Sequence, residues 1–433
     1  MDRTATSSAA VLLTGGLAIG ILSTLAAQKL LSPCDPKVPI SNDSRTTILD
    51  DGTYGTEDIR KNLTECVGNT PLLRINSLSD FTGCEILGKC EFLNPGGSIK
   101  DRVASHILTT VPLPPHSTLY EGTVGSTGLS LTTFSLSLSH RTHIILPSDQ
   151  SQEKISLLRK LGATVELVPP APIVDPNHFV NLSERRAADH TAAWEAGEEG
   201  VEGKGYFVDQ FENNMNYEAH EKSTGPEIWR QCGGRVDAFV AGAGTGGTIS
   251  GVARYLHSRQ THLPPNERTE IVLADPEGSG LYNKVRHGVM FDLKEREGTR
   301  RRHQVDTIVE GIGCNRLTAN FAAGLELVGD AVRVTDKEAM AMAKLMVERE
   351  GLFLGSSSCV NLVASLKTAL RMKKEITYKE GGEPTPTRIV TILCDSGTRH
   401  LSKFWKEVGD VGGRDGRPAT TVEDVLNASV KTI

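Results

Sequence analysis

From residue 66 onward, apolar residues gather in short runs separated by segments with a longer, helix-like spacing. Runs typical of buried strands occupy residues 85–91, 117–120, 142–146, 163–168, 236–241 and 270–275. Helical patterns follow most of these runs, for example at residues 151–161 and 249–257. Strands that alternate with helices predict a parallel sheet covered on both faces, so we expect an α/β fold.

The first part of the chain has a different pattern. Residues 4–28 carry no charge, and residues 9–27 form a nearly continuous apolar run that is long enough to cross a bilayer as a helix. We therefore expect a short tail at residues 1–8 and a transmembrane or signal-anchor helix at residues 9–31. A cleaved secretory signal and a buried helix are the alternatives.

The charges near this apolar run predict its orientation. Most of the positive charge, at Lys29, Lys37 and Arg45, follows the run, so we expect the rest of the chain to face the cytosol. An uncleaved span of this modest hydrophobicity favours the mitochondrial outer membrane.

Bulk composition narrows the class of protein. A chain of 433 residues suggests two or three units, and a net charge of −6 argues against a nucleic-acid-binding surface, which is normally basic. The substrate is therefore expected to be small. The eight cysteines show no Cys-x-x-Cys pair and no Cys/His cluster at zinc spacing, which predicts mostly reduced thiols and no metal site.

One short stretch offers a candidate reactive amine. Residues Asn94 to Arg102 read Asn-Pro-Gly-Gly-Ser-Ile-Lys-Asp-Arg, a glycine turn followed by a helix start with Ser98 as a candidate cap. Lys100 would thus lie near a helix N-terminus, where the helix dipole and Arg102 favour the neutral amine that a Schiff base requires, and burial would add to this effect. Taken alone, such a lysine is more often a solvated surface residue.

A second candidate site directly follows a buried-type apolar run. Residues Gly242 to Thr248 open a helix, and backbone N–H groups flanked by glycine at a helix start can hold a phosphate. Gly242, Gly244 and Gly247 also fit the Gly-x-Gly-x-x-Gly pattern of dinucleotide-binding proteins. Asp275 lies beyond the offset of about 20 residues expected there for an acid that binds ribose. A dehydrogenase is the alternative interpretation of this patch.

The stretch around Lys100 resembles the Asn-Pro-Thr-Gly-Ser-Val-Lys-Asp-Arg segment of the cysteine synthase and cystathionine β-synthase family. Further segments similar to that family follow the same order, at residues 67–74, 123–128, 205–214, 244–248 and 390–401. The resemblance spans about residues 67–403. It implies a pyridoxal 5'-phosphate enzyme of fold type II, the two-domain tryptophan synthase β-like architecture, and a homodimer.

This resemblance sets the expected domain limits. The catalytic region is expected at residues 61–408, with a smaller α/β subdomain at about 102–212 and a larger one formed by 61–101 and 213–408. Residues 32–60, rich in Ser, Asn, Asp and Gly, predict a linker, and residues 409–433 a polar tail.

The resemblance also implies roles for residues that would hold the cofactor. Lys100 matches the family's lysine, which carries the cofactor and later acts as the general base. Ser396 matches the hydroxyl that faces the pyridine nitrogen. The residues expected at the cofactor phosphate are Gly244, Thr245, Gly246, Gly247 and Thr248.

A separate loop is expected to hold the substrate. By resemblance, its carboxylate would meet Gln210 and a loop that contains Thr123, Gly125, Ser126 and Thr127. Ser126 also counts as cofactor-binding, because the family usually has Asn there, and its amide donates to the cofactor's ring oxygen. Ser126 can donate only through a rotatable hydroxyl. The resemblance therefore implies the fold more directly than it implies the substrate preference.

The expected reaction makes L-cysteine from O-acetyl-L-serine and sulfide, with release of acetate. The sequence shows neither a haem-binding N-terminal region nor a C-terminal regulatory pair, so cysteine synthase is preferred over cystathionine β-synthase. Cystathionine β-synthase and serine or threonine dehydratase are alternatives, and a membrane-tethered, cofactor-binding protein with little catalysis is an alternative of another class. The expected partners are O-acetylserine, sulfide and a membrane, without nucleic acid.

Overall fold

The computed structural model describes residues 59–150, 152–292, 307–375, 385–411 and 419–429. The chain divides into two units, Met1–Arg60 and Lys61–Ile433, and the fold described below is that of the second. The predicted tail at residues 1–8, the predicted membrane helix at 9–31 and nearly all of the predicted linker lie outside the described residues.

The predicted membrane location is corrected by the structure. Within the described ranges, no helix combines the length and the apolar composition that crossing a bilayer requires. The longest of these helices, Ser356–Glu375, carries Lys367, Arg371 and Lys373 in its second half. The prediction of an anchored protein at the mitochondrial outer membrane is therefore wrong.

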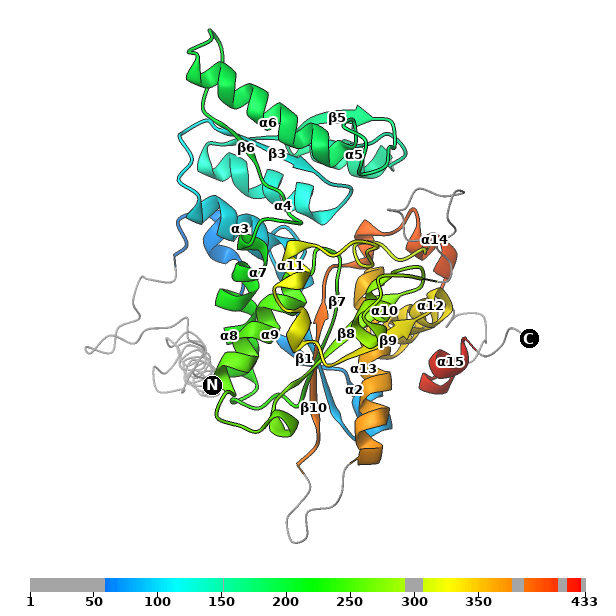
Figure 1. The fold of residues 1–433 in the computed structure, drawn as a ribbon. Helices are drawn as coiled ribbons and strands as arrows, with labels where there is room; N and C mark the ends of the chain where they lie inside the picture. The colour runs from blue at the N-terminus through cyan, green and yellow to red at the C-terminus, as the bar shows by residue number, and fades with distance from the viewer. Residues whose placement is uncertain (1–58, 151, 293–306, 376–384, 412–418, 430–433) are drawn as a thin grey trace, which may run out of the picture. The chain divides into compact units, whose positions relative to one another are not determined.

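A six-stranded sheet forms the larger part of the fold. Its strand order is β1-β2-β10-β7-β8-β9, with β1 antiparallel to β2 and all other neighbours parallel (Figure 1). The strands are β1 (Leu72–Arg74), β2 (Glu85–Cys90), β7 (Ala238–Gly242), β8 (Glu270–Pro276), β9 (Asp330–Val334) and β10 (Arg388–Leu393).

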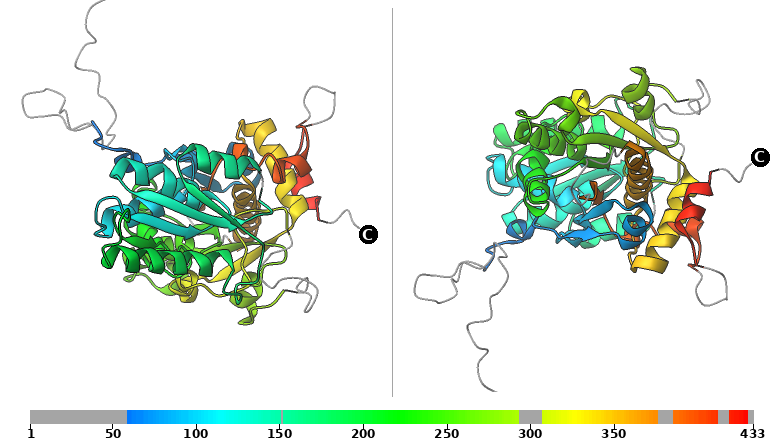
Figure 2. Two further views of the ribbon diagram at one scale, coloured as in Figure 1. Left: turned by 90° about the horizontal axis from the view of Figure 1, so that it is seen from above. Right: turned by 90° about the horizontal axis from the view of Figure 1, so that it is seen from below.

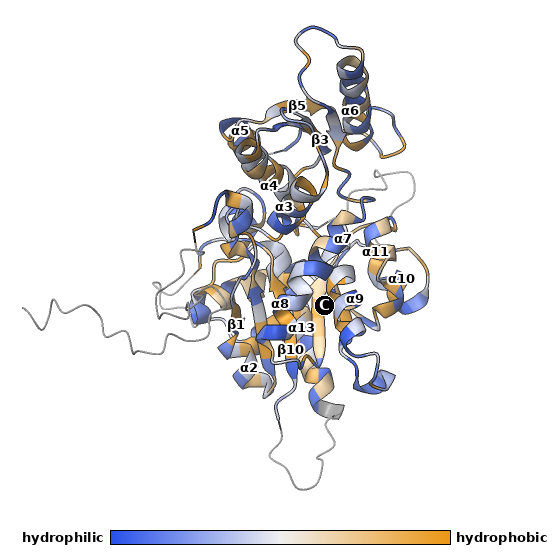
Figure 3. Cartoon of the chain, turned by 90° about the vertical axis from the view of Figure 1, so that its left-hand side faces the viewer, coloured by the Kyte–Doolittle hydropathy of each residue, from blue (hydrophilic) through white to orange (hydrophobic). Residues whose placement is uncertain are grey.

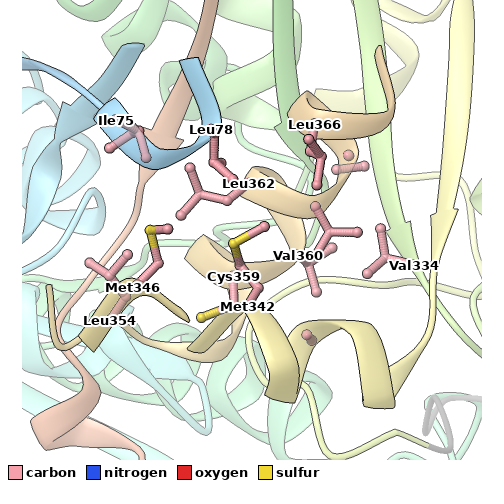
Figure 4. Close-up of a cluster of buried hydrophobic side chains, with 14 of the residues drawn as sticks. Ile75, Leu78, Val334, Met342, Met346, Leu354, Cys359, Val360, Leu362 and Leu366 are labelled. Carbon is pink, nitrogen blue, oxygen red and sulfur yellow. The ribbon is translucent and has the colours of Figure 1, made fainter. Parts of the chain in front are cut away.

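Side chains of the larger sheet alternate between two cores. Ala238 and Val240 point into one core, whereas Phe239 and Ala241 point into the other, as the two-residue period of a strand requires. The first core is closed by α12 (Asp336–Leu345) and α13 (Ser356–Glu375), from which Figure 4 shows Met342, Cys359 and Leu362 packed together. In Figure 3 the hydrophobic colour gathers inside this layered arrangement and the hydrophilic colour on the outer helices and loops.

Helices cover both faces of this sheet. Those associated with it are α2 (Asn76–Thr82), α7 (Met215–Ala219), α8 (Gly225–Gln231), α9 (Gly247–Arg259), α10 (Leu281–His287), α11 (Ala319–Ala322), α12 (Asp336–Leu345), α13 (Ser356–Glu375), α14 (Phe404–Val408) and α15 (Val422–Asn427). Two π-helical turns, His220–Thr224 and Met346–Glu350, continue α7 and α12.

A second, four-stranded sheet is parallel throughout and has the order β5-β4-β3-β6. Its strands are β3 (Thr118–Gly122), β4 (Arg141–Pro147), β5 (Thr164–Val168) and β6 (Gly205–Phe207). Leu119, Ile144 and Leu146 pack toward α3 (Lys100–Thr110), α4 (Ser126–Ser135) and α5 (Gln152–Lys160), and Ile145 packs toward α6 (Phe179–Glu195) on the other face. Figure 2 shows this layering from above.

The predicted strands lie within a few residues of the observed ones, and the predicted α/β class is confirmed. Strands β1, β6 and β9 were not predicted; β1 and β6 have only three residues, which is too short to show a periodic pattern. The strands of the smaller sheet fall between residues 118 and 207, whereas the predicted domain limits themselves stay a prediction.

Candidate functional site

Three loops meet at one edge of the larger sheet. Strands β2, β10 and β7 are neighbours and parallel, so their carboxyl ends lie together, where ligands bind in open α/β sheets. The loop after β2 leads to Lys100, the loop after β7 begins at Ala243, and the loop after β10 contains Asp395. A cavity of about 580 Å³ opens at this edge and extends to the loop after β3 in the smaller sheet.

Most of the predicted site residues line this cavity. They are Lys100, Thr123, Gly125, Ser126, Thr127, Gln210, Gly244, Thr245, Gly246 and Thr248. Gly247 lies just behind, as the first residue of α9. Ser396 is not among the lining residues, and its hydroxyl donates to the Phe353 carbonyl at 3.4 Å and accepts from Thr398 N–H at 3.3 Å. Its predicted contact with the cofactor therefore stays a prediction.

Lys100 is the first residue of α3, as expected, and its N–H donates to the Ser98 hydroxyl at 3.3 Å. Burial lowers the pKa of the Lys100 amine, while the neighbouring Cys394 and Asp395 act in the opposite direction. Burial, which the sequence reasoning added to the helix dipole and Arg102, is thus the largest cause, whereas Arg102 is not among the groups that act on Lys100. A neutral amine facing a cavity is the form that reacts with a carbonyl.

Arg102 belongs instead to a buried ionic network that sequence reasoning missed. Its guanidinium contacts Glu91 at 2.7 Å and Glu227 at 2.8 Å, and Lys89 contacts Glu227 at 2.6 Å. These four side chains are buried and come from β2, the turn that follows it, α3 and α8. The network therefore fixes the start of α3, and with it Lys100, to the larger sheet.

The glycines of the loop after β7 make room for close backbone contacts. A Cβ at Gly244 would lie 2.2 Å from the Gly311 carbonyl oxygen, and one at Gly247 would lie 2.0 Å from Asn216 Oδ1. Gly246 has a φ of 85°, which favours glycine. The first N–H groups of α9 have no intrahelical acceptor and sit at the positive end of the helix dipole, so this loop can bind an anion.

Two threonine hydroxyls of this loop contact polar side chains of the neighbouring segment 216–220. Asn216 Nδ2 donates to Thr245 Oγ1 at 2.9 Å, and His220 Nε2 lies 3.2 Å from Thr248 Oγ1. Burial lowers the pKa of His220 well below its usual range, and the nearby Lys100 contributes in the same direction. His220 is therefore a neutral hydrogen-bonding partner rather than a charge.

The loop after β3 leads into α4 on the opposite side of the cavity. Ser126 is the first residue of α4, and Gly125 precedes it without a capping side chain. Arg399 Nη1 donates to Ser126 Oγ at 3.3 Å. Gln210 follows Asp209, which has a φ of 51° and so turns the chain toward the loop. Thr127 Oγ1 donates to Gln210 Oε1 at 2.6 Å.

A row of interacting charged side chains lines another wall of the cavity, and it was not predicted from the sequence. His400 lies 3.0 Å from both Glu310 and Asp395, and Lys154 pairs with Glu310 at 2.8 Å. Burial alone would lower the pKa of His400, but the two carboxylates raise it to about 9. No local sequence pattern could have revealed this row of side chains, because Lys154 and Glu310 are 156 positions apart.

A family model described as pyridoxal-phosphate dependent enzyme matches residues 63–395. The chain belongs to this family. Cysteine synthase 2 of Emericella nidulans is 55% identical over 87% of this chain and 86% of that protein. Cysteine synthase 2 of Schizosaccharomyces pombe is 54% identical over 81% of this chain and 85% of that protein.

A solved structure gives the same result for the fold. The O-acetylserine dependent cystathionine beta-synthase from Helicobacter pylori superposes with a TM-score of 0.61 at 27% identity, over 80% of this chain and 98% of that one. The predicted family, the fold type II architecture, the cofactor and the class of enzyme, a cysteine synthase, are thereby confirmed. The dinucleotide alternative loses its support, because Asp275 does not line the cavity and its carboxylate accepts from Tyr282 N–H at 2.7 Å.

The residues present fit pyridoxal 5'-phosphate. The cofactor needs an amine for its aldehyde and donors for its phosphate. Lys100 supplies an amine with a lowered pKa at the cavity, and the loop from Gly244 to Thr248 supplies N–H and hydroxyl groups, in a backbone course that leaves no room for a Cβ at Gly244 or Gly247.

Proposed function

We propose that this pyridoxal-phosphate-dependent enzyme makes L-cysteine and acetate from O-acetyl-L-serine and sulfide in the cavity at Lys100. The observation that carries the proposal is the position of the buried Lys100 amine between two loops that each lead into a helix N-terminus, one after β7 and one after β3. One loop suits the cofactor phosphate and the other suits the carboxylate of an amino acid.

Lys100 has two tasks in this proposal. Its Nζ holds the cofactor covalently, and after substrate has taken that place the freed amine removes the proton from the substrate Cα. Burial lowers the pKa of Lys100, which favours the unprotonated amine that can accept that proton. The cofactor, when bound, supplies the stabilisation of the negative charge left on Cα.

The remaining residues bind and orient. The N–H groups of Gly246, Gly247 and Thr248, with the hydroxyls of Thr245 and Thr248, hold the phosphate. The neutral imidazole of His220 contacts Thr248 from behind and keeps its hydroxyl in place. Ser396 is assigned to the pyridine nitrogen by resemblance.

The substrate carboxylate is assigned to the start of α4. Thr123, Gly125, Ser126 and Thr127 lie on this loop and Gln210 lies beside it, all lining the same cavity as Lys100. The helix dipole of α4 and its free N–H groups favour an anion here. A substrate held there has its Cα and its leaving group between this loop and the amine.

Reduction with borohydride followed by peptide mapping tests the assignment directly. The label is expected on Lys100 in the native enzyme and in a Lys154→Arg control, and on no residue of a Lys100→Ala variant. Purified enzyme should also form cysteine from O-acetylserine and sulfide. A label on another lysine, or cystathionine formed from serine and homocysteine without cysteine synthesis, would overturn the proposal.

We also propose that the enzyme is a homodimer. The support for it is the family to which the chain belongs. Sedimentation velocity should give twice the chain mass of 46.6 kDa, and a monomer at micromolar concentration would contradict it.

A further inference from the structure

A buried carboxyl lies directly below the substrate loop and has no part in the mechanism above. Glu121 is the fourth residue of β3, and its side chain is 1% exposed. Its Oε1 accepts from Gln210 Nε2 at 2.8 Å, whereas its Oε2 is buried without a hydrogen-bond partner. No ion pair of the described residues includes Glu121. A buried carboxylate without a cation is strongly disfavoured, so the neutral acid is the expected form.

The groups around Glu121 also favour its neutral, protonated form. Burial raises the pKa of Glu121 to about 8, and the hydrogen bond from the Gln210 side chain opposes the shift, as do the backbone N–H groups of Gln210 and Asp209. Asp209, on the segment after β6, is the charged group that acts on Glu121, and its negative charge raises the pKa further.

Glu121 is the inner end of a line of three side chains that reaches the cavity. Thr127 Oγ1 donates to Gln210 Oε1 at 2.6 Å, and Gln210 Nε2 donates to Glu121 Oε1 at 2.8 Å. With this polarity the Thr127 hydroxyl hydrogen points away from the cavity. Only its lone pairs remain for a ligand, and they repel a carboxylate.

The opposite polarity suits a bound carboxylate. If the Gln210 amide turns by half a revolution, Glu121 donates its carboxyl hydrogen to Gln210 Oε1, Gln210 Nε2 donates to Thr127 Oγ1, and the Thr127 hydroxyl donates into the cavity. The two ends of an amide have nearly the same shape, so this needs no repacking. Little is lost, because the other amide contact, to the Gly122 carbonyl, is 3.4 Å long.

We propose that Glu121 is a positioning residue that works in its neutral form: it donates to Gln210, reverses the hydrogen-bond line, and so aims the Thr127 hydroxyl at the α-carboxylate of the amino-acid substrate. This inference rests on the proposed function, which places that carboxylate at the start of α4. An ionised Glu121 has no hydrogen to donate and cannot support the reversed line.

Proton linkage follows from this role. Substrate binding requires the protonated carboxyl, so binding takes up a proton wherever free Glu121 is ionised. With a pKa of about 8, affinity is constant below pH 7 and falls about tenfold between pH 7 and pH 9. At pH 8 about half a proton is taken up per ligand bound.

Calorimetry on the holoenzyme tests the proposal without turnover. The probes are propionate, which has a carboxylate but no amine that titrates, and L-alanine, which has no leaving group. Titrations at pH 6 to 9 in buffers of different ionisation enthalpy give both affinity and proton uptake. Wild type is expected to lose about tenfold in propionate affinity by pH 9 and to take up about half a proton at pH 8.

Two variants separate a positioning role from a structural one. Glu121→Gln keeps the shape and a permanent donor, so its propionate affinity should stay constant from pH 6 to 9 without proton uptake. Thr127→Val breaks the line at its other end and leaves the carboxyl in place, so it should also bind without proton uptake. The cofactor absorbance and the unfolding temperature of each variant report whether the site is intact.

The proposal is overturned if Glu121→Gln shows the same pH dependence as wild type, or if Thr127→Val still takes up the proton. Failure of the proposed function is a different result. It would appear in wild type as borohydride label away from Lys100 or as absence of cysteine synthesis, both of which are independent of how Glu121 titrates.

Discussion

Replacing Arg102 with methionine tests whether the buried ionic network holds the start of α3 in place. Methionine keeps an unbranched stem and removes only the guanidinium. That group donates to Glu91 at 2.7 and 2.8 Å and to Glu227 at 2.8 Å twice. Lys89 remains paired with Glu227 in the variant, so Glu91, which is 0% exposed, loses its direct cation partner.

The size of the effect follows from this geometry. Removing one partner of a buried ion pair costs about 3–5 kcal/mol, because the other charge is left without compensation. A typical domain is stable by about 5–15 kcal/mol, so Arg102→Met should remove about a fifth of the stability or more. Adding Glu91→Gln removes the uncompensated charge and should restore about 1–3 kcal/mol.

Urea unfolding with saturating cofactor, followed by tryptophan fluorescence, measures these differences. Arg254→Met is the matched control, since Arg254 pairs with Glu221 at 2.9 Å but is 40% exposed, and its loss should cost less than about 1 kcal/mol. A cost for Arg102→Met no larger than that of the control would refute the argument. So would a double variant with Glu91→Gln that is less stable than Arg102→Met alone.

The same network predicts acid sensitivity. Burial alone would raise the pKa of Glu227, but Arg102 and Lys89 lower it to about 2 from 4.5. A carboxyl with a depressed pKa stabilises the fold above its unfolded value and loses that contribution as pH falls. Wild type should therefore lose stability between about pH 5 and pH 2, and Arg102→Met should lose less over this range.

Three further changes test other parts of the site. Gly247→Ala places a Cβ 2.0 Å from a buried amide oxygen and should weaken cofactor binding to the apoenzyme at least about tenfold, whereas Gly329→Ala, with nothing within 4 Å, should not. Because the folded pKa of His400 is raised from 6.5 to about 9, its stabilisation is present below pH 6.5 and is lost as pH rises through 9. The difference in unfolding temperature between wild type and His400→Gln should therefore shrink from pH 7 to pH 10, and a constant difference would contradict this. Lys154→Met removes an ion pair worth about 1 kcal/mol at the cavity wall and should raise the KM for O-acetylserine roughly fivefold, while Lys160→Met on the same helix should leave it unchanged.

Features with a local signal could be predicted from the sequence. Apolar runs of five to seven residues mark β4, β7 and β8, and the glycines from Gly242 to Gly247 mark a helix start that can bind an anion. Lys100 was found because it follows a glycine-containing turn at a helix start, and because the segment around it resembles that of a known family. Each of these signals is contained within about ten residues.

Features that depend on distant residues could not be predicted. Nothing in the sequence pairs Lys154 with Glu310 or shows that His400 lies between two carboxylates, because these contacts exist only when the two sheets are assembled. The same holds for Cys394 and Asp395, which oppose the effect of burial on the pKa of Lys100 and lie far from it in the sequence. Amphipathic and apolar patterns report one face of an element and not its partner.

The place of β10 in the larger sheet has a consequence for synthesis on the ribosome. This strand, Arg388–Leu393, is inserted between β2 and β7, although it is made roughly 150 residues after β7. The strands of the smaller sheet are all complete by residue 207 and can assemble while translation continues. A nascent chain therefore lacks the central strand of its larger sheet, and the loop after this strand that lines the cavity, until almost all of the chain has been translated.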